Sequence, residues 1–403
     1  MTNPLARDLE HVLEHTGDVW PHLQGARIFV TGGTGFFGCW LLESFAWASD
    51  RLQLDASLTV LTRSPEAFRR KAPHLASHPA IHLVHGDIRS FPFPAGHFSH
   101  VIHGASEASR TLNQEQPLPM LDTIVNGTRR ALDFAATAEA RRFLLISSGA
   151  VYGPQPPVMA RLPETYGGGP DPIEPRSVYG EGKRLAELLC ALYSRDHGLD
   201  CLVVRGFAFV GPHLPLDVHF AIGNFIGDCL KRRPLEIRGD GTPYRSYLYA
   251  ADLAIWLWTI LVRGESCRPY NVGSERGLSI AELAAMVVAA LEPVLEPTIA
   301  MRVRGLPRPG AAPERYVPDT SRARLELGLR ELVTLEDAIR RTAEWHTPAA
   351  VSNRMMHAES EGGARGYGYP KPAKSSVEQL LVLRRREARQ EAHEAGHHGK
   401  DLR

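Results

Sequence analysis

A loop with four glycines in seven residues constrains this chain more than any other feature of its sequence. The loop lies in FVTGGTGFFG, residues 29–38, between an apolar β-branched run and a segment with apolar residues at helical spacing. Its glycines fit Gly33-x-Gly35-x-x-Gly38 and also Gly32-x-x-Gly35-x-x-Gly38. Glycine lets a backbone turn tightly and approach a pyrophosphate, which then meets the N–H groups of the following helix. We therefore predict a dinucleotide-binding loop here rather than a plain strand–helix turn.

Short β-branched or apolar runs alternate with helical patterns through the first half of the chain. Helical spacing is clear in residues 40–48 and 120–138, and later in 220–231, 250–263 and 279–291. The expected strands are residues 27–31, 58–62, 81–85, 100–103, 143–147 and 201–205. Strands that alternate with helices predict an α/β fold with a doubly wound parallel sheet of the Rossmann type.

The domain organisation follows from shifts in composition along the chain. Residues 1–24 form a lead-in segment, in which residues 4–23 predict a short amphipathic helix. Residues 25–205 are expected to be the dinucleotide-binding domain. Residues 206–346 contain more Pro, Gly and aromatic residues, and we expect a smaller mixed lobe there, with strands that return to the main sheet. Residues 347–403 are expected to be a linker and a disordered or helical tail.

Net charge, cysteine content and apolar runs bear on the partners and the location that we expect for this chain. The 403-residue chain has a net charge of +1, so no overall field favours nucleic acid or an acidic membrane. Its five cysteines are scattered and odd in number, which suits reduced thiols better than a disulfide framework. No signal-peptide pattern opens the chain, and its longest apolar run, residues 254–262, falls short of the roughly 20 residues of a membrane span. We expect a cytoplasmic protein without nucleic-acid or membrane partners.

The end of the second expected strand bears on the choice between NAD and NADP. A carboxylate there would bind the ribose 2′-OH, whereas an arginine accommodates a 2′-phosphate. This chain reads TVLTRSPEAF and places Arg63 and Ser64 at that point. Arg63 suggests NADP, and a solvated loop arginine is an equally supported interpretation. The third strand runs into HGDIRS, which brings Asp87 and Ile88 to the edge of the site, although such an acid can also simply cap a turn.

A Tyr-x-x-x-Lys pair carries the predicted chemistry. Tyr179 and Lys183 in SVYGEGKRLAE lie four residues apart, so a helix places both side chains on one face. A neighbouring ammonium favours the phenolate, and we expect it to lower the pKa of the tyrosine so that the pair acts as a base. About thirty residues earlier, LLISSGAVYG ends a strand at Ser147 and Ser148, and a serine there can hydrogen-bond a reacting hydroxyl or carbonyl. An exposed helix pair is the simpler alternative.

With the glycine loop, the serine and the Tyr/Lys pair in this order, the chain resembles the extended short-chain dehydrogenases/reductases, specifically the NAD(P)-dependent nucleotide-sugar epimerases and dehydratases. The resemblance covers about residues 25–345. Further matching segments are residues 126–135, 205–212, 239–254, 270–274 and 318–328. It implies that Tyr179 is the base, that Lys183 holds the nicotinamide ribose and that Ser148 assists. Hydride then leaves C4 of the sugar for the nicotinamide and gives a transient 4-keto sugar.

The resemblance also implies binding residues and partners. The substrate would be a nucleotide-diphosphate sugar held by the lobe of residues 206–346, and the family implies a homodimer through two paired helices. The implied substrate-binding residues are Ser148, Ala208, Asn224 and Arg245, and an arginine suits a diphosphate because its donors pair with two oxygens at once. The implied cofactor-binding residues are Gly32, Gly35, Phe36, Phe37, Gly38, Arg63, Asp87, Ile88, His103, Ala105, Tyr179 and Lys183.

Departures from the family narrow the reaction. Many 4,6-dehydratases have an acid just after the serine or threonine, where this chain has Gly149 and Ala150. Dehydration would then need a carboxylate from elsewhere, such as Glu107. A second departure is Ala208, at a position where members of the family commonly have an asparagine that faces the substrate. We predict a 4-epimerase, with an NADPH-dependent 4-keto-sugar reductase or a non-standard dehydratase as alternatives. A dinucleotide-binding sensor or scaffold is the non-enzyme alternative, which the retained Tyr/Lys pair disfavours.

The tail contains HEAGHH, and residues 393–397 fit the zinc-protease pattern H-E-x-x-H. Such a site needs a stable helix and a third ligand, but Gly396 weakens a helix and only six residues follow His397. We interpret the motif as part of a solvated tail and predict no catalytic metal.

Overall fold

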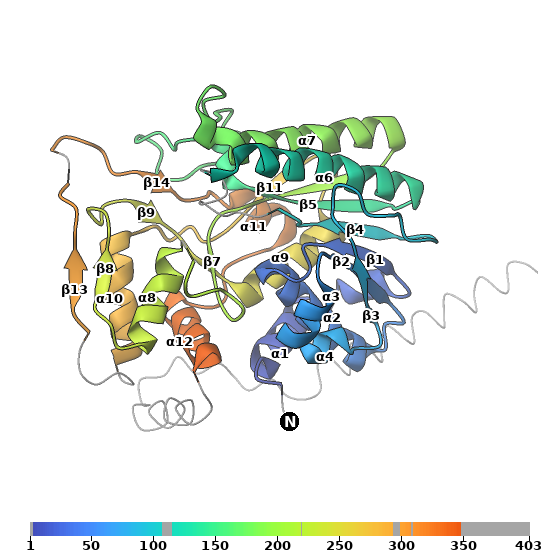
Figure 1. Cartoon of the computed structure of the whole chain (residues 1–403), viewed down its shortest axis with the longest axis horizontal. Helices are drawn as coiled ribbons and strands as arrows, with labels where there is room; N and C mark the ends of the chain where they lie inside the picture. Colours follow the sequence, from blue (N-terminus) through green and yellow to red (C-terminus); the bar gives the residue numbers. More distant parts are fainter. Residues whose placement is uncertain (1–2, 107–114, 219, 293–298, 308, 348–403) are drawn as a thin grey trace, which may run out of the picture. The chain divides into compact units, whose positions relative to one another are not determined.

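The computed structural model describes residues 3–106, 115–218, 220–292, 299–307 and 309–347 (Figure 1). Glu107 and the H-E-x-x-H motif lie outside these residues, as does the predicted tail. Within the described residues, no helix is both long and apolar enough to cross a membrane. All five cysteines are free.

A seven-stranded sheet forms the centre of the fold, and every pair of neighbouring strands in it is parallel (Figure 1). The strand order is β11-β6-β5-β4-β1-β2-β3, so the first six strands follow the Rossmann order. The predicted doubly wound sheet is therefore confirmed. The strands are β1 (Arg27–Thr31), β2 (Ser57–Thr62), β3 (Ile81–His85), β4 (His100–His103), β5 (Arg142–Ser148), β6 (Asp200–Gly206) and β11 (Pro269–Val272).

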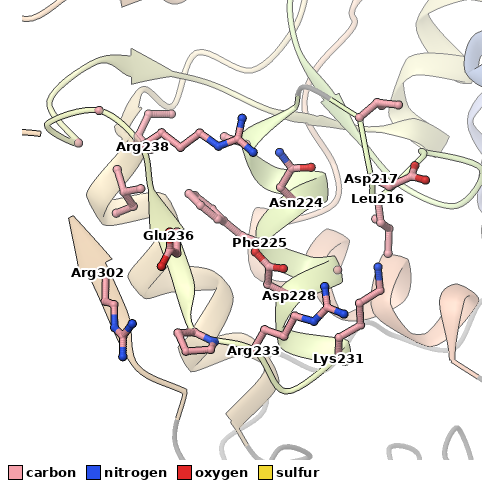
Figure 2. Close-up of a pocket in the computed structure, with 18 of the residues that line it drawn as sticks. Leu216, Asp217, Asn224, Phe225, Asp228, Lys231, Arg233, Glu236, Arg238 and Arg302 are labelled. Carbon is pink, nitrogen blue, oxygen red and sulfur yellow. The ribbon is translucent and has the colours of Figure 1, made fainter. Parts of the chain in front are cut away.

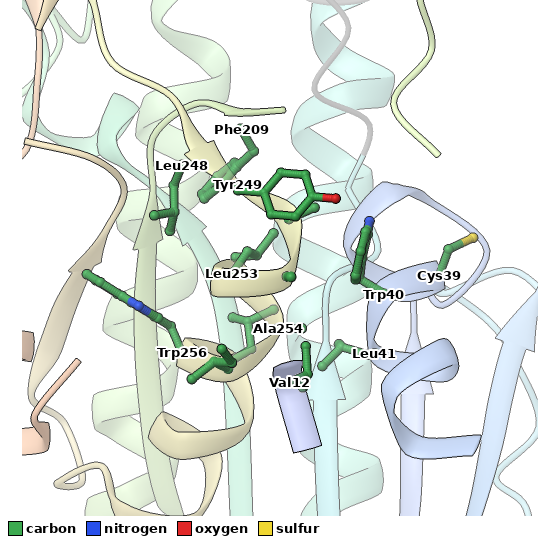
Figure 3. Close-up of a cluster of buried hydrophobic side chains, with 14 of the residues drawn as sticks. Val12, Cys39, Trp40, Leu41, Phe209, Leu248, Tyr249, Leu253, Ala254 and Trp256 are labelled. Atoms are coloured by element: carbon green, nitrogen blue, oxygen red, sulfur yellow. The ribbon is translucent and has the colours of Figure 1, made fainter. Parts of the chain in front are cut away.

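Helices cover both faces of this sheet because its strands are apolar on both sides. One face carries α1 (Ala6–His15), α2 (Phe36–Leu52) and α9 (Ala250–Arg263), which contact one another. The other carries α6 (Pro117–Thr137) and α7 (Val178–His197). Figure 3 shows how side chains of the first three helices meet in one buried cluster, in which Val12, Trp40 and Leu253 are at most 1% exposed. This packing fixes the glycine loop, which leads into α2.

The lead-in segment differs from the single helix that residues 4–23 predict. Helix α1 ends at His15, a turn follows, and a short 3₁₀ helix η1 covers Trp20–Leu23. Pro21 cannot donate the helical hydrogen bond to residue 17, and Gly17 has low helix propensity, so the α-helix does not continue beyond His15 through these residues. The hydroxyl of Thr16 secures the break, because it donates to the carbonyl of Val12 at 2.6 Å and accepts from the indole of Trp20 at 2.8 Å.

Beyond β6 the chain builds smaller units. Helices α8 (Ala221–Leu230) and α10 (Ile280–Leu291) contact each other and the short β8 (Leu235–Ile237). Ser279 and Glu282 form a capping box at the start of α10. The remaining elements are α3 (Pro65–Lys71), α4 (Pro73–Ala76), η2 (Gly149–Tyr152), η3 (Pro175–Ser177), β7 (Phe209–Val210), β9 (Tyr244–Arg245), β10 (Leu248–Tyr249), β12 (Leu278–Ser279), β13 (Met301–Val303), β14 (Arg315–Tyr316), α11 (Ser321–Leu327) and α12 (Leu335–His346).

Candidate active site

The glycine loop has the geometry that a dinucleotide cradle requires. Gly32 has a φ of 74°, and a Cβ on it would lie 2.5 Å from the carbonyl carbon of Gly104. A Cβ on Gly38 would overlap the backbone of Gly33, so the first turn of α2 packs directly against the loop. Gly35 is the N-cap of α2 and exposes the N–H groups of that turn. The loop therefore fits the pyrophosphate of a dinucleotide at the positive end of a helix.

Two phenylalanines begin α2 and anchor it, so their side chains serve packing. Both are partly buried against the core beneath the loop. The ring of Phe37 lies 4.8 Å from the ring of Phe209, centroid to centroid. The backbone N–H groups of both residues lie in the first turn of α2, beside the glycine loop.

The ends of β2 and β3 carry charges of both signs. Arg63 is exposed after β2, and the hydroxyl of Ser64 caps α3 by accepting from the N–H of Ala67. Asp87 follows β3 and accepts two bonds from the guanidinium of Arg89, at 2.8 and 3.0 Å. Those bonds lower the pKa of Asp87 to about 2, and the charge of Arg63 also lowers it. The Asp87 carboxylate is thus ionised but already paired, close enough to Arg63 to offset part of its charge.

His103 and its neighbours form a buried support for the strand ends. The ring of His103 lies between the hydroxyls of Thr31 and Thr128, at 2.7 and 3.1 Å. Burial lowers the pKa of His103 to about 3, so the ring is neutral. The N–H of Ala105 donates to Thr31, and Ile88 is buried against Gly127. The imidazole of His103 is therefore held inside the protein by two threonines.

Ser148, Tyr179 and Lys183 converge at the carboxyl end of β5. Ser148 accepts from the N–H of Ala150 at 3.2 Å and lies near enough to Tyr179, in the first turn of α7, to lower its pKa. The ammonium of Lys183 donates to the carbonyl of Ile146 at 2.7 Å and lies 5.9 Å from the centre of the Tyr179 ring. The structure thus brings together the three residues that the spacing of the motifs predicts.

The direction of the tyrosine pKa is opposite to the prediction. Burial raises the pKa of Tyr179, and only Ser148 works against that increase. The ammonium of Lys183 does not lower it, because the lysine side chain turns to the carbonyl of Ile146 instead. Burial also lowers the pKa of Lys183 to about 8. Four-residue spacing places the two side chains on one face, but it does not determine where the ammonium points.

A buried ionic network behind Lys183 was not predicted. Glu187 follows Lys183 by one helical turn and accepts from the hydroxyl of Ser147 at 2.6 Å and from two nitrogens of Arg205. Arg205 also donates to the hydroxyl of Tyr152 at 2.9 Å. The carboxylate of Glu187 raises the pKa of Lys183 and so opposes the effect of burial. Glu187 lies within the predicted catalytic segment, but its partners come from β5, β6 and η2.

A second phenol reaches the catalytic trio from far along the chain. Burial raises the pKa of Tyr316 in β14, and Ser148 lies near enough to work against that increase. Its ring lies 4.6 Å from that of Phe207. A Cβ on Gly149 would lie 2.7 Å from the Tyr316 hydroxyl and 2.8 Å from the Phe207 ring. Gly149 therefore makes room for the phenol of Tyr316. Tyr316 lies two residues before the 318–328 segment, and nothing local in the sequence marks it.

A cavity of about 900 Å³ lies between α8 and β8. Figure 2 shows Asn224 and Arg238 at one end of it, the ring of Phe225 between the elements, and Lys231 and Arg233 at the other end. Asn224 thus lines the cavity as a substrate residue would. Its charged lining residues are Asp217, Asp228, Lys231, Arg233, Glu236, Arg238 and Arg302. Glu236 is paired with Arg304, which leaves the cationic groups in excess.

Two other predicted substrate residues lie outside this cavity lining. Arg245 in β9 donates to the carbonyl of Tyr244 at 2.8 Å, and its guanidinium carbon lies 6.0 Å from the centre of the Tyr316 ring. Ala208 is partly buried between β6 and β7, and its carbonyl accepts from the N–H of Leu248. Arg245 therefore lies near the second phenol, on the catalytic side.

A Rossmann sheet, a glycine cradle and a Ser/Tyr/Lys trio at the end of β5 define an enzyme of the extended short-chain dehydrogenase/reductase type. Residues 28–273 match the family described as NAD dependent epimerase/dehydratase. A UDP-glucuronic acid decarboxylase from Arabidopsis thaliana is 30% identical over 336 residues, which cover 83% of this chain and 72% of that protein. The chain belongs to the NAD dependent epimerase/dehydratase family, and the prediction of an NAD(P)-dependent enzyme of the nucleotide-sugar epimerase/dehydratase type is confirmed at the level of the family.

Solved structures agree with this assignment. The structure of a dTDP-glucose 4,6-dehydratase from Streptomyces venezuelae, determined with NAD bound, is 26% identical and has a TM-score of 0.66. It matches 79% of this chain and 96% of its own. A UDP-glucuronic acid 4-epimerase from Bacillus cereus is 22% identical, with a TM-score of 0.65 over 79% of this chain and 98% of its own. The second structure shows the shared fold.

Proposed function

We propose that this enzyme is a UDP-sugar 4-epimerase that acts through a transient 4-keto sugar. The observation that carries the proposal is the composition of the site. Ser148, Tyr179 and Tyr316 meet at the end of β5, while the following positions, Gly149 and Ala150, lack any side chain that could move a proton. Such a site can support hydride transfer and one proton transfer. Dehydration across C5 and C6 needs further acid–base groups.

The residues divide the work as follows. Tyr179 takes the proton of the C4 hydroxyl, and Ser148 holds the same oxygen by a hydrogen bond. Lys183, with a pKa of about 8, is mostly protonated at neutral pH and would hold the ribose of the nicotinamide nucleotide. NAD⁺ bound at the glycine loop would accept hydride from C4 and return it. Tyr316 stays protonated because its pKa is raised, so it donates to the C4 oxygen rather than accepting from it.

The cavity at α8 is the proposed site of the nucleoside diphosphate. Cationic side chains exceed carboxylates there once Glu236 is paired with Arg304, which suits two phosphate groups. Asn224 offers an amide toward the same space. We assign uridine as the base because the Arabidopsis thaliana relatives are UDP-glucuronic acid decarboxylases and the Bacillus cereus epimerase was determined in complex with UDP-glucuronic acid.

Decarboxylation of UDP-glucuronic acid is the second candidate. It is favoured by the Arabidopsis thaliana decarboxylases, which are about 30% identical to this chain. A 4-keto uronic acid is a β-keto acid, so it loses carbon dioxide with the keto group as the electron sink. This step needs the same oxidation at C4 and no carboxylate beside Ser148.

Product analysis distinguishes the two reactions. The purified enzyme is incubated with NAD⁺ and either UDP-glucuronic acid or UDP-glucose, and the products are separated and weighed by mass spectrometry. An epimer of unchanged mass supports the proposal, whereas a product that has lost carbon dioxide selects the decarboxylase. Tyr179→Phe should reduce turnover by at least about 10²-fold while cofactor binding persists. Full activity of that variant would refute the mechanism.

The cofactor preference rests on Arg63. We propose that the site accepts NADP⁺ as well as NAD⁺, because an arginine and no carboxylate follows β2. The nearby carboxylate of Asp87 weakens this preference without reversing it, since Arg89 already pairs with it. Titration of the purified protein with both dinucleotides measures the ratio of affinities.

We also propose the homodimer that the family implies, formed through α6 and α7. Leu185, Leu188 and Leu192 lie on one stripe of α7 and are 41, 55 and 36% exposed. Leu118 of α6 is also exposed. Light scattering after size exclusion should give the mass of a dimer, and Leu188→Glu should shift it to that of a monomer.

A further inference from the structure

Helix α1 carries a group of potential metal ligands outside the catalytic site. His11, Glu14 and His15 lie at positions i, i+3 and i+4, so they share one face of the helix. One ligand atom of each lies within 4.8 Å of the other two. Glu14 and His15 are exposed, and His11 is partly exposed. This helix precedes residue 28, where the match to the family begins.

Each histidine has its second ring nitrogen directed at an acceptor. Nδ1 of His15 lies 2.8 Å from the carbonyl oxygen of His11. Nε2 of His11 faces Oδ1 of Asp252 at 3.6 Å, and both atoms are buried without a hydrogen-bond partner in the described part of the chain. Histidines that bind metals usually donate their other N–H to a carboxylate or a backbone carbonyl, which fixes the ring. Here His11 faces a carboxylate, that of Asp252, and His15 faces a backbone carbonyl, that of His11.

Asp252 is itself held firmly in place. It lies in the first turn of α9 and is 0% exposed, and its Oδ2 accepts from the N–H groups of Leu332 and Val333 at 2.9 and 3.0 Å. The other oxygen, Oδ1, is the one that faces His11. A proton on Nε2 of His11 would satisfy this oxygen and leave Nδ1 to bind a cation. Asp252 therefore favours the tautomer of His11 whose free nitrogen, Nδ1, is on the same ring as the buried Nε2 and is available to a cation.

The electrostatic setting also favours a cation. The three residues occupy the last turns of α1, where backbone carbonyls make the helix end negative. Two imidazoles and one carboxylate form a donor set that suits zinc and its neighbours among the transition metals, whereas calcium and magnesium prefer oxygen ligands alone.

We propose that His11, Glu14 and His15 bind one Zn²⁺ ion, and that this ion fastens α1 to α9 through the contact between His11 and Asp252. The site is structural and lies apart from the chemistry at β5. Its occupancy should raise the melting temperature of the whole protein, because α1 packs on both α2 and α9.

Zinc titration of the full-length, tag-free protein tests the proposal. Calorimetry should show one tight site, and saturating Zn²⁺ should raise the melting temperature by at least about 2 °C. His15→Ala should abolish both effects. Because His15 is exposed, the variant should fold as the wild type does, and circular dichroism checks this. His22→Ala, an exposed histidine of the same lead-in segment, is the matched control and should bind zinc as the wild type does.

The histidines of the tail provide the competing explanation. A variant with His393, His397 and His398 all changed to alanine should keep the tight site and the thermal shift. If that variant loses them while His15→Ala keeps them, zinc binds the tail and the proposal is refuted. Failure of the wild type to bind zinc refutes it as well. None of these readouts depends on turnover, so the result is independent of the proposed reaction.

Discussion

Replacing Lys183 by methionine should make the protein more stable while abolishing its activity. Lys183 is 3% exposed, and burial lowers its pKa from 10.5 to about 8. The folded state therefore holds a charged lysine in a place that disfavours the charge. Methionine is of similar length and carries no charge to desolvate.

The magnitude follows from the pKa values. A difference between 10.5 and about 8 corresponds to about 3 kcal/mol of unfavourable free energy when lysine is protonated in both states. Methionine also loses the charged hydrogen bond from the ammonium to the carbonyl of Ile146, which costs about 2 kcal/mol. The net gain in the free energy of unfolding at pH 7 should be about 1 kcal/mol.

The pH dependence gives the prediction its direction. Below pH 8 Lys183 is protonated in both the folded and the unfolded state, so the folded wild type bears the full unfavourable free energy of burying the charge. Between pH 8 and 10.5 the unfolded state keeps the proton that the folded state has lost, so the stability of the wild type rises with pH. The advantage of Lys183→Met should therefore shrink across this window.

Urea unfolding of the cofactor-free proteins at pH 7 and pH 9.5 measures both effects. If Lys183→Met is less stable than the wild type at pH 7, or if its advantage grows with pH, the buried lysine is not a source of strain. Lys183→Arg is a useful control because it keeps the charge in place, and it should not be more stable than the wild type.

Three further predictions concern the surroundings of the site. Glu187→Gln should lower the pKa of Lys183 further and move the alkaline limb of the pH–rate profile to lower pH, whereas an unmoved limb would leave Glu187 with a structural role only. Arg63→Ala should weaken NADP⁺ binding about tenfold and leave NAD⁺ binding unchanged, and equal effects in fluorescence titrations would remove Arg63 from the phosphate site. Gly149→Ala should reduce kcat at least about tenfold by displacing the hydroxyl of Tyr316 from Ser148, with Gly17→Ala as the control because a Cβ there meets nothing within 4 Å. Wild-type kcat in Gly149→Ala would show that Tyr316 has no part in turnover.

The sheet was predictable because local patterns determine it. All six predicted strands are present within one residue at each end, since buried parallel strands are short, apolar and bounded by polar residues. The helix predicted over residues 4–23 is present only as α1, Ala6–His15, because the apolar spacing continues across Gly17 and Pro21, which do not favour an α-helix. Gly17 and Pro21 therefore affect the backbone here more strongly than the helical spacing of apolar residues does.

The candidate site was predictable only where its residues are close in sequence. The spacing of the motifs predicted that Tyr179, Lys183 and Ser148 lie together, as they do at the end of β5. It could not reveal that the ammonium of Lys183 turns to Ile146 or that burial raises the pKa of Tyr179. Tyr316 was missed because its place beside Ser148 depends on the pairing of β14 with β9.

Gly149 and Tyr316 together explain why we expect the site to donate a proton to the C4 oxygen of the sugar and not to catalyse dehydration across C5 and C6. An acidic side chain at residue 149 would occupy the space that the Tyr316 hydroxyl and the Phe207 ring fill. The phenol that takes its place has a raised pKa, so it remains protonated at neutral pH and donates without accepting. Glu187, the carboxylate of the network behind Lys183, is bound to Arg205 and Ser147. Burial raises the pKa of Tyr179 as well, so the two pKa shifts alone do not decide which phenol accepts the proton. We propose Tyr179 as the acceptor because the Tyr-x-x-x-Lys motif places it on the same helix face as Lys183.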